Sequence, residues 1–320
     1  MAVHLLTPRM AGVLDRIRRA NRPPFHTMSP VQARAAYAAG AEVLDLPRAP
    51  LARVEDLRLP AGDGGVRPAR LYAARGREAG PQPVLLYLHG GGFVLGNLET
   101  HDSLCRQLAL RSGAAVVALD YRLAPEHRFP AAWDDVWSAL TALHSGATDL
   151  GLDGRRIAIG GDSAGGTLAA ATALRARDEG LQLVLQLLVT PGIGDRADSG
   201  SRRLFANGFL IDAATVHWFF DHAVPPEHRR DPRFAPIEAP EHEGLCPALL
   251  LLAECDPVFD DGIGYADRLR LAGVPVDLEI YRGVTHDFMK MGRVLPEALL
   301  ALDRAAVALR LAWNLEGDLK

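Results

Sequence analysis

Cysteine and lysine are both scarce in this chain of 320 residues. The three cysteines, Cys105, Cys246 and Cys255, are odd in number and share no spacing typical of metal ligands. A disulfide framework and a metal site are therefore not expected, and we predict a reducing, cytoplasmic location. Only Lys290 and Lys320 are lysines, so nearly all of the 35 basic residues are arginine.

Long apolar runs and an excess of positive charge are also missing. No segment approaches the roughly 18 consecutive apolar residues that a membrane-spanning helix needs. The first twenty residues have no apolar signal-peptide core, and Met10, Val13, Leu14 and Ile17 instead recur at helical spacing. The formal net charge of −4 argues against a nucleic-acid-binding surface. We therefore expect no membrane span, no nucleic-acid partner and no export.

Short apolar runs bounded by turn residues predict β-strands along most of the chain. The run VLLYL at 84–88 is apolar throughout, which suits a strand buried on both faces of a parallel sheet covered by helices. The sequence AGDGG at 61–65 indicates a hairpin between the first two runs. The eight expected strands are residues 54–59, 66–72, 84–88, 115–120, 156–160, 183–189, 248–253 and 276–281. The predicted fold class is α/β, with a mostly parallel central sheet of about eight strands flanked by helices.

Two segments fall outside this alternation of strands and helices. Residues 1–46 form two expected helices split by NRPPFHTMSP, and residues 199–224 place many aromatic side chains between two expected strands. This second segment is either ordinary core or a lid over a site. Four divisions are predicted. They are an N-terminal helical cap segment (1–50), the first part of the core (51–198), a cap insertion (199–240) and the second part of the core (241–320).

The sequence IAIGGDSAGGT at 157–167 surrounds one serine with glycines. Within it, residues 161–165 fit the G-x-S-x-G nucleophile elbow, directly after an expected strand and before an expected helix. A serine on such a sharp turn is strained, and side chains two positions away on either side would collide with it. The stretch lacks the lysine and the glycine spacing of phosphate-binding loops. Ser163 is therefore a candidate nucleophile.

The sequence HGGG at 89–92 follows another expected strand. Its three glycines bring bare backbone amides close to a ligand, and this motif type forms the oxyanion hole of esterases and lipases. A flexible turn is the alternative reading. The position at the end of a strand, upstream of the serine, favours the oxyanion hole.

A nucleophilic serine needs a base, and the base needs an orienting carboxylate. His286 lies just beyond the last expected strand, and Asp256 lies just beyond the strand before it. Along the chain the residues come in the order Ser, Asp, His, which is the order typical of α/β-hydrolases. Asp260 or Asp261 could replace Asp256 as the orienting group. The histidines of the insertion and polar loops are read as solvated or packing residues, not metal ligands; they are His217, His222, His228 and His242.

All of these signals fall immediately after expected strands. HGGG, Ser163, Asp256 and His286 would therefore meet at one edge of the sheet, because the carboxyl ends of parallel strands lie together and ligands bind there.

From about residue 80 to 290 the chain resembles the α/β-hydrolase superfamily, and within it the hormone-sensitive-lipase-like (family IV) carboxylesterases. The resemblance is carried by HGGGFVLGNLETHD, DYRLAPEHRFPAAWDD, GGDSAGG, PALLLLAECDPVFDDG, YADRLRLAGVPV and the final histidine. It implies the α/β-hydrolase fold, Ser163 as nucleophile, His286 as general base and Asp256 as its orienter. In one respect the chain departs from the family pattern, which usually has glycine after the catalytic histidine, because here Asp287 stands in that place.

The resemblance also implies the surroundings of the triad. The amides of Gly91, Gly92 and Ala164 would form the oxyanion hole, and the N-terminal helices with the 199–224 insertion would form a helical cap. Residues 120–130 would be a structural loop that supports the site. Pairing of the exposed last strand is a common route to dimers among such relatives, so a homodimer through residues 276–281 is an expectation. Candidate residues for the substrate pocket are Phe93, Phe205, Phe209, Leu210 and Trp218.

The predicted function is hydrolysis of short- to medium-chain carboxylic esters by a serine carboxylesterase, through an acyl-enzyme intermediate and without a cofactor. The partner would be a small-molecule ester. An amidase, a carbamate hydrolase or a lactonase could use the same triad. A non-enzymatic ligand-binding relative on the same fold is the alternative from another class, but such relatives tend to lose a triad member, and all three are present here.

Overall fold

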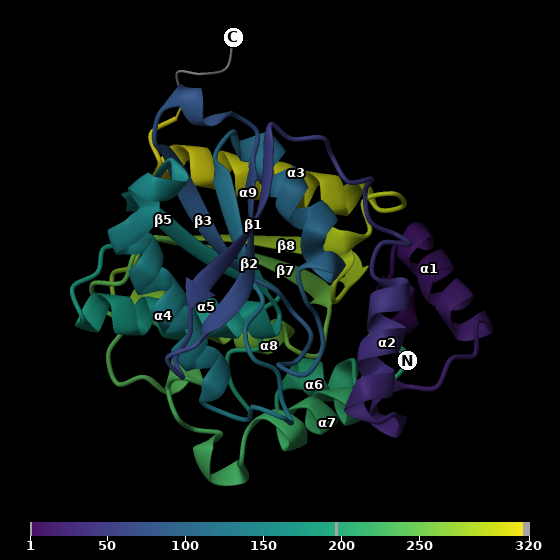
Figure 1. Cartoon of the computed structure of the whole chain (residues 1–320). Helices are drawn as coiled ribbons and strands as arrows, with labels where there is room; N and C mark the ends of the chain where they lie inside the picture. The colour runs from purple at the N-terminus through teal and green to yellow at the C-terminus, as the bar shows by residue number, and fades with distance from the viewer. Residues whose placement is uncertain (1, 196–197, 316–320) are drawn as a thin grey trace.

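A single eight-stranded sheet forms the centre of the computed structural model, which describes residues 2–195 and 198–315. Its strand order is β1-β2-β4-β3-β5-β6-β7-β8. The β1–β2 and β2–β4 pairs are antiparallel, and all other neighbours are parallel. The strands are β1 (Arg53–Pro60), β2 (Val66–Ala73), β3 (Gln82–Leu88), β4 (Ala115–Leu119), β5 (Leu152–Asp162), β6 (Gln186–Val189), β7 (Ala248–Cys255) and β8 (Val276–Thr285). The predicted fold class is confirmed (Figure 1).

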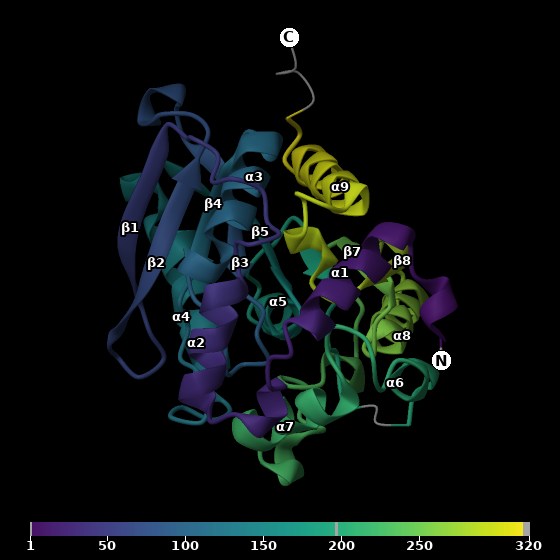
Figure 2. The same cartoon turned by 90° about the vertical axis from the view of Figure 1, so that its right-hand side faces the viewer.

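Helices cover both faces of this sheet (Figure 2). One face packs against α4 (Ala131–Gly146), α5 (Ala164–Asp178) and α8 (Phe259–Leu271), and the other against α3 (Asp102–Ser112) and α9 (Pro296–Ala312). β3 is buried along its whole length because its side chains alternate between two hydrophobic clusters. Leu86 belongs to the first cluster, whereas Leu85 and Tyr87 belong to the second. This double burial accounts for the unbroken apolar run in the sequence.

The N-terminal segment forms two helices, α1 (Pro8–Arg19) and α2 (Pro30–Gly40), as predicted. Each begins with a proline after a hydroxyl side chain, a combination that favours a helix start. Thr7 Oγ1 accepts a hydrogen bond from the Met10 amide, and Ser29 forms a capping box with Gln32. The two helices then diverge, because α1 packs beside β8 whereas α2 stands at the carboxyl end of the strands (Figure 2).

The insertion between β6 and β7 contains α6 (Gly200–Leu204) and α7 (Ala213–Ala223). α7 touches η2 (Phe25–Thr27), the short 3₁₀ helix that precedes α2. His26 Nδ1 lies 3.3 Å from Thr215 Oγ1, so the two predicted cap segments are in contact beyond the strand ends. The other 3₁₀ helices are η1 (Ala2–Leu5), η3 (Arg77–Ala79), η4 (Glu99–His101), η5 (Ala147–Leu150), η6 (Pro226–His228), η7 (Pro236–Glu238) and η8 (Phe288–Lys290).

Three sequence expectations concern the outer surface and limits of the fold. Across residues 2–195 and 198–315, the helices are too short or too polar to cross a membrane. β8 is an edge strand, and the homodimer through it stays a prediction, as do the four proposed divisions of the chain. The described residues do not include Met1, 196–197 or 316–320. The first and last predicted divisions therefore extend beyond them, and Lys320 lies outside them.

Candidate active site

Ser163 lies on the sharp turn between β5 and α5, at the carboxyl edge of the sheet. Its φ of +53° is in a region that non-glycine residues rarely adopt, which is the strain expected of a nucleophile elbow. The Ser163 amide donates to the carbonyl of Val189 at 2.8 Å and so fixes the turn to the end of β6. α5 begins at the next residue, Ala164.

The glycines on either side of Ser163 allow the turn to pack against β3. A Cβ atom at Gly161 would lie 2.3 Å from the carbonyl oxygen of Leu88, and one at Gly165 would lie 1.9 Å from it. Any side chain at these positions would push the turn away from the central strand. This close approach explains why the sequence clears both flanks of the serine.

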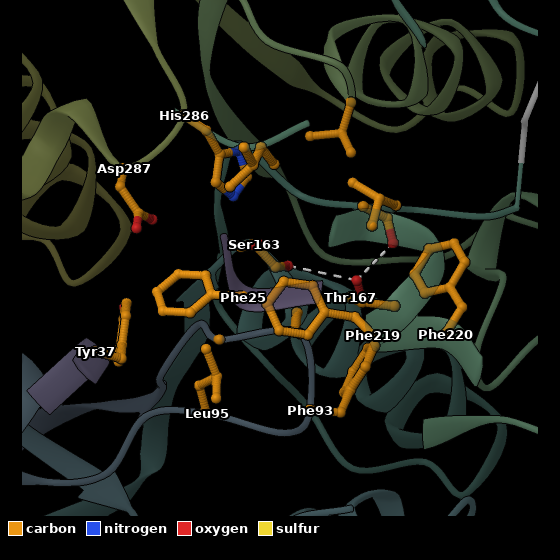
Figure 3. Close-up of a pocket in the computed structure, with 17 residues that line it drawn as sticks. Phe25, Tyr37, Phe93, Leu95, Ser163, Thr167, Phe219, Phe220, His286 and Asp287 are labelled. Atoms are coloured by element: carbon orange, nitrogen blue, oxygen red, sulfur yellow. Dashed lines mark hydrogen bonds between the residues drawn. The ribbon is translucent and has the colours of Figure 1, made fainter. Parts of the chain in front are cut away.

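His286 and Asp256 are brought together as the sequence predicts. The two residues follow β8 and β7, which are neighbours in the sheet, and His286 Nδ1 lies 2.6 Å from Asp256 Oδ2. Both side chains are almost completely buried. Burial lowers the pKa of His286, but the negative charge of Asp256 and its hydrogen bond outweigh burial and raise that pKa to about 9. His286 and Ser163 line the same pocket (Figure 3).

The carboxylates and the histidine that could replace Asp256 and His286 contact other groups. Asp260 Oδ2 accepts a hydrogen bond from the Ser201 amide at 2.8 Å, and Asp261 forms a buried ion pair with Arg202 at 3.0 Å. His222 Nδ1 lies 2.8 Å from the carbonyl oxygen of Trp218, on its own helix. The structure therefore favours Asp256 over Asp260 and Asp261 as the residue that orients His286.

The HGGG segment forms a loop directly after β3. Gly91 and Gly92 have φ values of +117° and +60°, so both need the freedom of glycine. Both line the pocket together with Ser163 and Ala164. Ala164 is the first residue of α5, where the amide has no acceptor within the helix. Three backbone donors thus border the space next to the candidate nucleophile.

Asp162 links this loop to the serine turn, a role that the sequence reasoning missed. Its Oδ1 accepts from the Gly90 amide at 3.1 Å and from the Tyr87 hydroxyl at 2.7 Å. Its Oδ2 lies 3.2 Å from Nε2 of His101. Burial alone would raise the pKa of Asp162, but the contacts with His101 and Tyr87 hold it below its usual range. The position of an aspartate directly before the candidate nucleophile is the sequence signal that could have indicated this role.

Residues 120–130 contact the HGGG loop from its other side. The Tyr121 hydroxyl donates to the carbonyl of His89 at 2.6 Å, and the Ala124 amide donates to that of Phe93 at 2.9 Å. The loop is therefore held between Asp162 and this segment. Such fixed donors are what stabilisation of a developing oxyanion requires.

The pocket has a mostly aromatic and aliphatic wall, and its volume is about 60 Å³. The expected residues need correction. Phe93 lines the pocket, but Phe205, Phe209, Leu210 and Trp218 do not. The insertion instead contributes Ile211, Val216, Phe219 and Phe220.

The helical face of α7 explains the difference. Phe219 and Phe220 stand three and four residues after Val216 and share its inward face, whereas the Trp218 ring lies tilted against His222 on another face of the helix. Phe205 and Phe209 pack edge to face on each other, with ring centroids 4.9 Å apart. The insertion thus forms part of the pocket wall, and the same inward side chains also belong to the hydrophobic core, so the lid stays a prediction.

The N-terminal segment also reaches the pocket, although none of its residues is among the candidates expected from the sequence. Phe25 from η2 and Tyr37 from α2 line it. Arg34 on α2 donates from Nε to the carbonyl of Val94 at 2.8 Å. No local pattern marks these side chains, because only the folded chain places them beside Ser163.

Asp287, the departure from the family pattern, has a φ of +59°. This left-handed conformation costs glycine nothing and is tolerated by aspartate better than by most residues. The backbone shape that favours glycine is therefore kept, while a carboxylate is added to the pocket wall.

Comparison with known proteins identifies the class. A family described as having the alpha/beta hydrolase fold matches residues 85–290. The chain belongs to this family, specifically to its hormone-sensitive-lipase-like (family IV) branch of carboxylesterases. It is a carboxylic ester hydrolase.

Individual relatives agree with this assignment. The chain is 43% identical over 249 residues to an ethyl acetate hydrolase of Pseudomonas putida, covering 77% of this chain and 78% of the relative. It is 40% identical over 283 residues to the esterase LipI of Mycobacterium tuberculosis, covering 84% and 86%. A crystal structure of an alpha/beta hydrolase enzyme from the metagenome of Lake Arreo has a TM-score of 0.93 at 37% identity, covering 97% of this chain and 99% of that chain.

Proposed function

We propose that the protein hydrolyses small carboxylic esters with short to medium acyl chains through a Ser163–His286–Asp256 triad. The observation that carries the proposal is the 2.6 Å contact of His286 Nδ1 with Asp256, at a pocket that also holds Ser163 and three backbone donors. This contact leaves Nε2 as the ring nitrogen that can serve the serine.

The proposed reaction has two halves. Ser163 Oγ attacks the ester carbonyl while His286 Nε2 takes its proton, and the amides of Gly91, Gly92 and Ala164 donate to the oxyanion. His286 then returns the proton to the leaving alcohol, so that an acyl-serine remains. Water activated by His286 releases the acid and restores the enzyme.

The size of the pocket supports the preference for shorter chains. A volume of about 60 Å³ is small for a ligand pocket, which is consistent with small esters. The wall formed by Phe93, Phe219 and Phe220 suits an apolar acyl chain. The Pseudomonas relative, named an ethyl acetate hydrolase, is consistent with a small substrate.

The test is a panel of p-nitrophenyl esters from acetate to palmitate. We expect kcat/KM to be highest for the short and medium acyl chains and to fall steeply towards palmitate. Ser163→Ala and His286→Ala should each lose at least about 10³-fold in kcat. His222→Ala is the matched control, because that histidine hydrogen-bonds within its own helix.

Two results would contradict the proposal. Hydrolysis by Ser163→Ala at the wild-type rate would show that the serine is not the nucleophile. A larger loss in His222→Ala than in His286→Ala would show that the base is misassigned. A p-nitroanilide of the favoured acid, run beside the ester, separates esterase from amidase activity.

A further inference from the structure

The candidate pocket has one polar end that the proposed chemistry leaves unused. Apart from Ser163 and His286, three of its lining residues carry polar side chains, namely Tyr37, Thr167 and Asp287. The Thr167 hydroxyl already donates to the carbonyl of Gly192 at 2.6 Å. Tyr37 and Asp287 are both on the side of Ser163 away from Thr167 in Figure 3, and the charge of Asp287 acts on the Tyr37 hydroxyl. These two residues are called the polar end below.

Asp287 contributes an unoccupied acceptor. Its carboxylate does not cap the helix η8 that it precedes, and it has no hydrogen bond or ion pair with the described part of the chain. The side chain is only partly buried and borders the pocket. A carboxylate in this state gains by accepting a hydrogen bond from a ligand.

Tyr37 contributes a donor. Nζ of Lys290 donates to the Tyr37 hydroxyl oxygen at 2.9 Å, so the tyrosine keeps its own proton for a further acceptor. Lys290 is only 6% exposed and is not among the residues that line the pocket. Its Nζ stands 4.8 Å from the centroid of the Tyr37 ring. The buried lysine thus fixes the tyrosine of the cap beside the loop that carries His286.

The position of His286 tells which part of an ester reaches the polar end. His286 must return a proton to the leaving oxygen, so the alcohol part of the ester begins next to the imidazole. Asp287 is the next residue in the chain, and it borders the pocket on the side of His286 (Figure 3). The alcohol part therefore extends towards Asp287 and Tyr37, and the acyl part towards the apolar wall.

We propose that the polar end binds a free hydroxyl on the alcohol part of the ester, so that monoesters of a diol or another polyol are preferred substrates. A hydroxyl can donate to Asp287 and accept from Tyr37 at the same time. Asp287 would repel an anionic group, and the charge of Lys290, which acts on Asp287, offsets the attraction of that carboxylate for a cationic group. The inference rests on the proposed function and specifies its leaving group.

The test compares two esters that differ in one group, 2-hydroxyethyl butyrate and propyl butyrate, by titration of the acid released. We expect wild-type kcat/KM to favour the hydroxyethyl ester by about tenfold over the ratio found in hydroxide-catalysed hydrolysis. Asp287→Gly suits the positive φ and removes the acceptor, so this preference should fall to near one. Tyr37→Phe should lower it about threefold. Because each value is a ratio on one enzyme, changes in His286 cancel.

Tyr265→Phe is the matched control, since that buried tyrosine lies on α8 outside the pocket lining. It should keep the wild-type ratio. Two results would overturn the inference and leave the esterase proposal standing. One is hydrolysis of both esters by the wild type without a preference for the hydroxyethyl ester, and the other is an unchanged preference in both Asp287→Gly and Tyr37→Phe. Faster hydrolysis of choline butyrate than of the hydroxyethyl ester would also overturn it. Failure to hydrolyse any of these esters would count against the proposed function itself.

Discussion

Asp256→Asn removes the negative charge that faces His286 Nδ1 and leaves the size of the side chain almost unchanged. The wild-type contact is 2.6 Å, and both partners are buried, so solvent screens the interaction little. The substitution therefore isolates the electrostatic part of the proposed triad.

The size of the effect follows from the pKa of His286. Its rise from 6.5 to about 9 corresponds to about 3 kcal/mol of extra stability for the imidazolium, which forms when the serine is deprotonated. Asp256 is the largest of the charges that raise this pKa. Losing that stabilisation alone would slow acylation by at least about 10²-fold, and an asparagine that holds the wrong imidazole tautomer would extend the loss to about 10⁴-fold.

The assay is kcat/KM for p-nitrophenyl butyrate from pH 6 to 10, corrected for hydrolysis without enzyme. Only neutral His286 can act as a base, so wild-type kcat/KM should rise with pH and level off near pH 9. In Asp256→Asn burial then dominates the pKa of His286, so the remaining activity should level off at a lower pH.

Asp260→Asn is the matched control, because Asp260 bonds to the Ser201 amide in the cap instead of to the histidine. It should keep kcat/KM within about tenfold of wild type and leave the pH profile in place. The reasoning is refuted if Asp256→Asn keeps more than a tenth of the wild-type kcat/KM. It is equally refuted if Asp260→Asn shows the larger loss.

Two further substitutions test the oxyanion loop and the residue after the histidine. Gly92→Ala should lower kcat/KM about 10²-fold, because the new Cβ would meet the Phe219 ring of the pocket wall and strain the backbone, at a φ of +60°, that carries a candidate oxyanion donor. An unchanged kcat/KM would contradict this expectation. Asp287→Asn should move the rise of kcat/KM to lower pH by less than Asp256→Asn does, since the Asp287 charge also raises the pKa of His286. A profile that stays in place would show that this carboxylate does not act on the histidine.

The strands could be predicted because each depends on a short stretch of sequence, and the same is true of the strand ends that carry Ser163, Asp256 and His286. All eight expected strands are present, yet their ends differ where pairing extends beyond the apolar run. β5 begins at Leu152, four residues earlier than expected, because its first residues already run beside the start of β3, where Gln82 pairs with Leu152. β6 begins at Gln186, three residues later than expected, although Val184 and Leu185 before it are already hydrogen-bonded to the backbone of β5.

The pocket wall could be predicted only in part, because its residues come from distant segments. The aromatic insertion drew attention to the correct region, but selecting its inward side chains requires the helical phase of α7, which Val216, Phe219 and Phe220 share. Tyr37 and Lys290 are 253 residues apart and meet only in the folded chain. Their pairing has no local signature.

Arg34 on α2 connects the N-terminal segment to the loop that carries the candidate oxyanion donors. Its guanidinium donates to the carbonyls of Val94 and Ala124 at 2.8 and 2.7 Å, and it forms an ion pair with Glu126 at 2.6 Å. Val94 follows HGGG in the chain, so a side chain from α2 holds the end of the loop that carries the candidate oxyanion donors. Displacing α2 would therefore loosen those donors as well as open the pocket. The N-terminal segment thus both lines the pocket and contacts the loop that carries the candidate oxyanion donors.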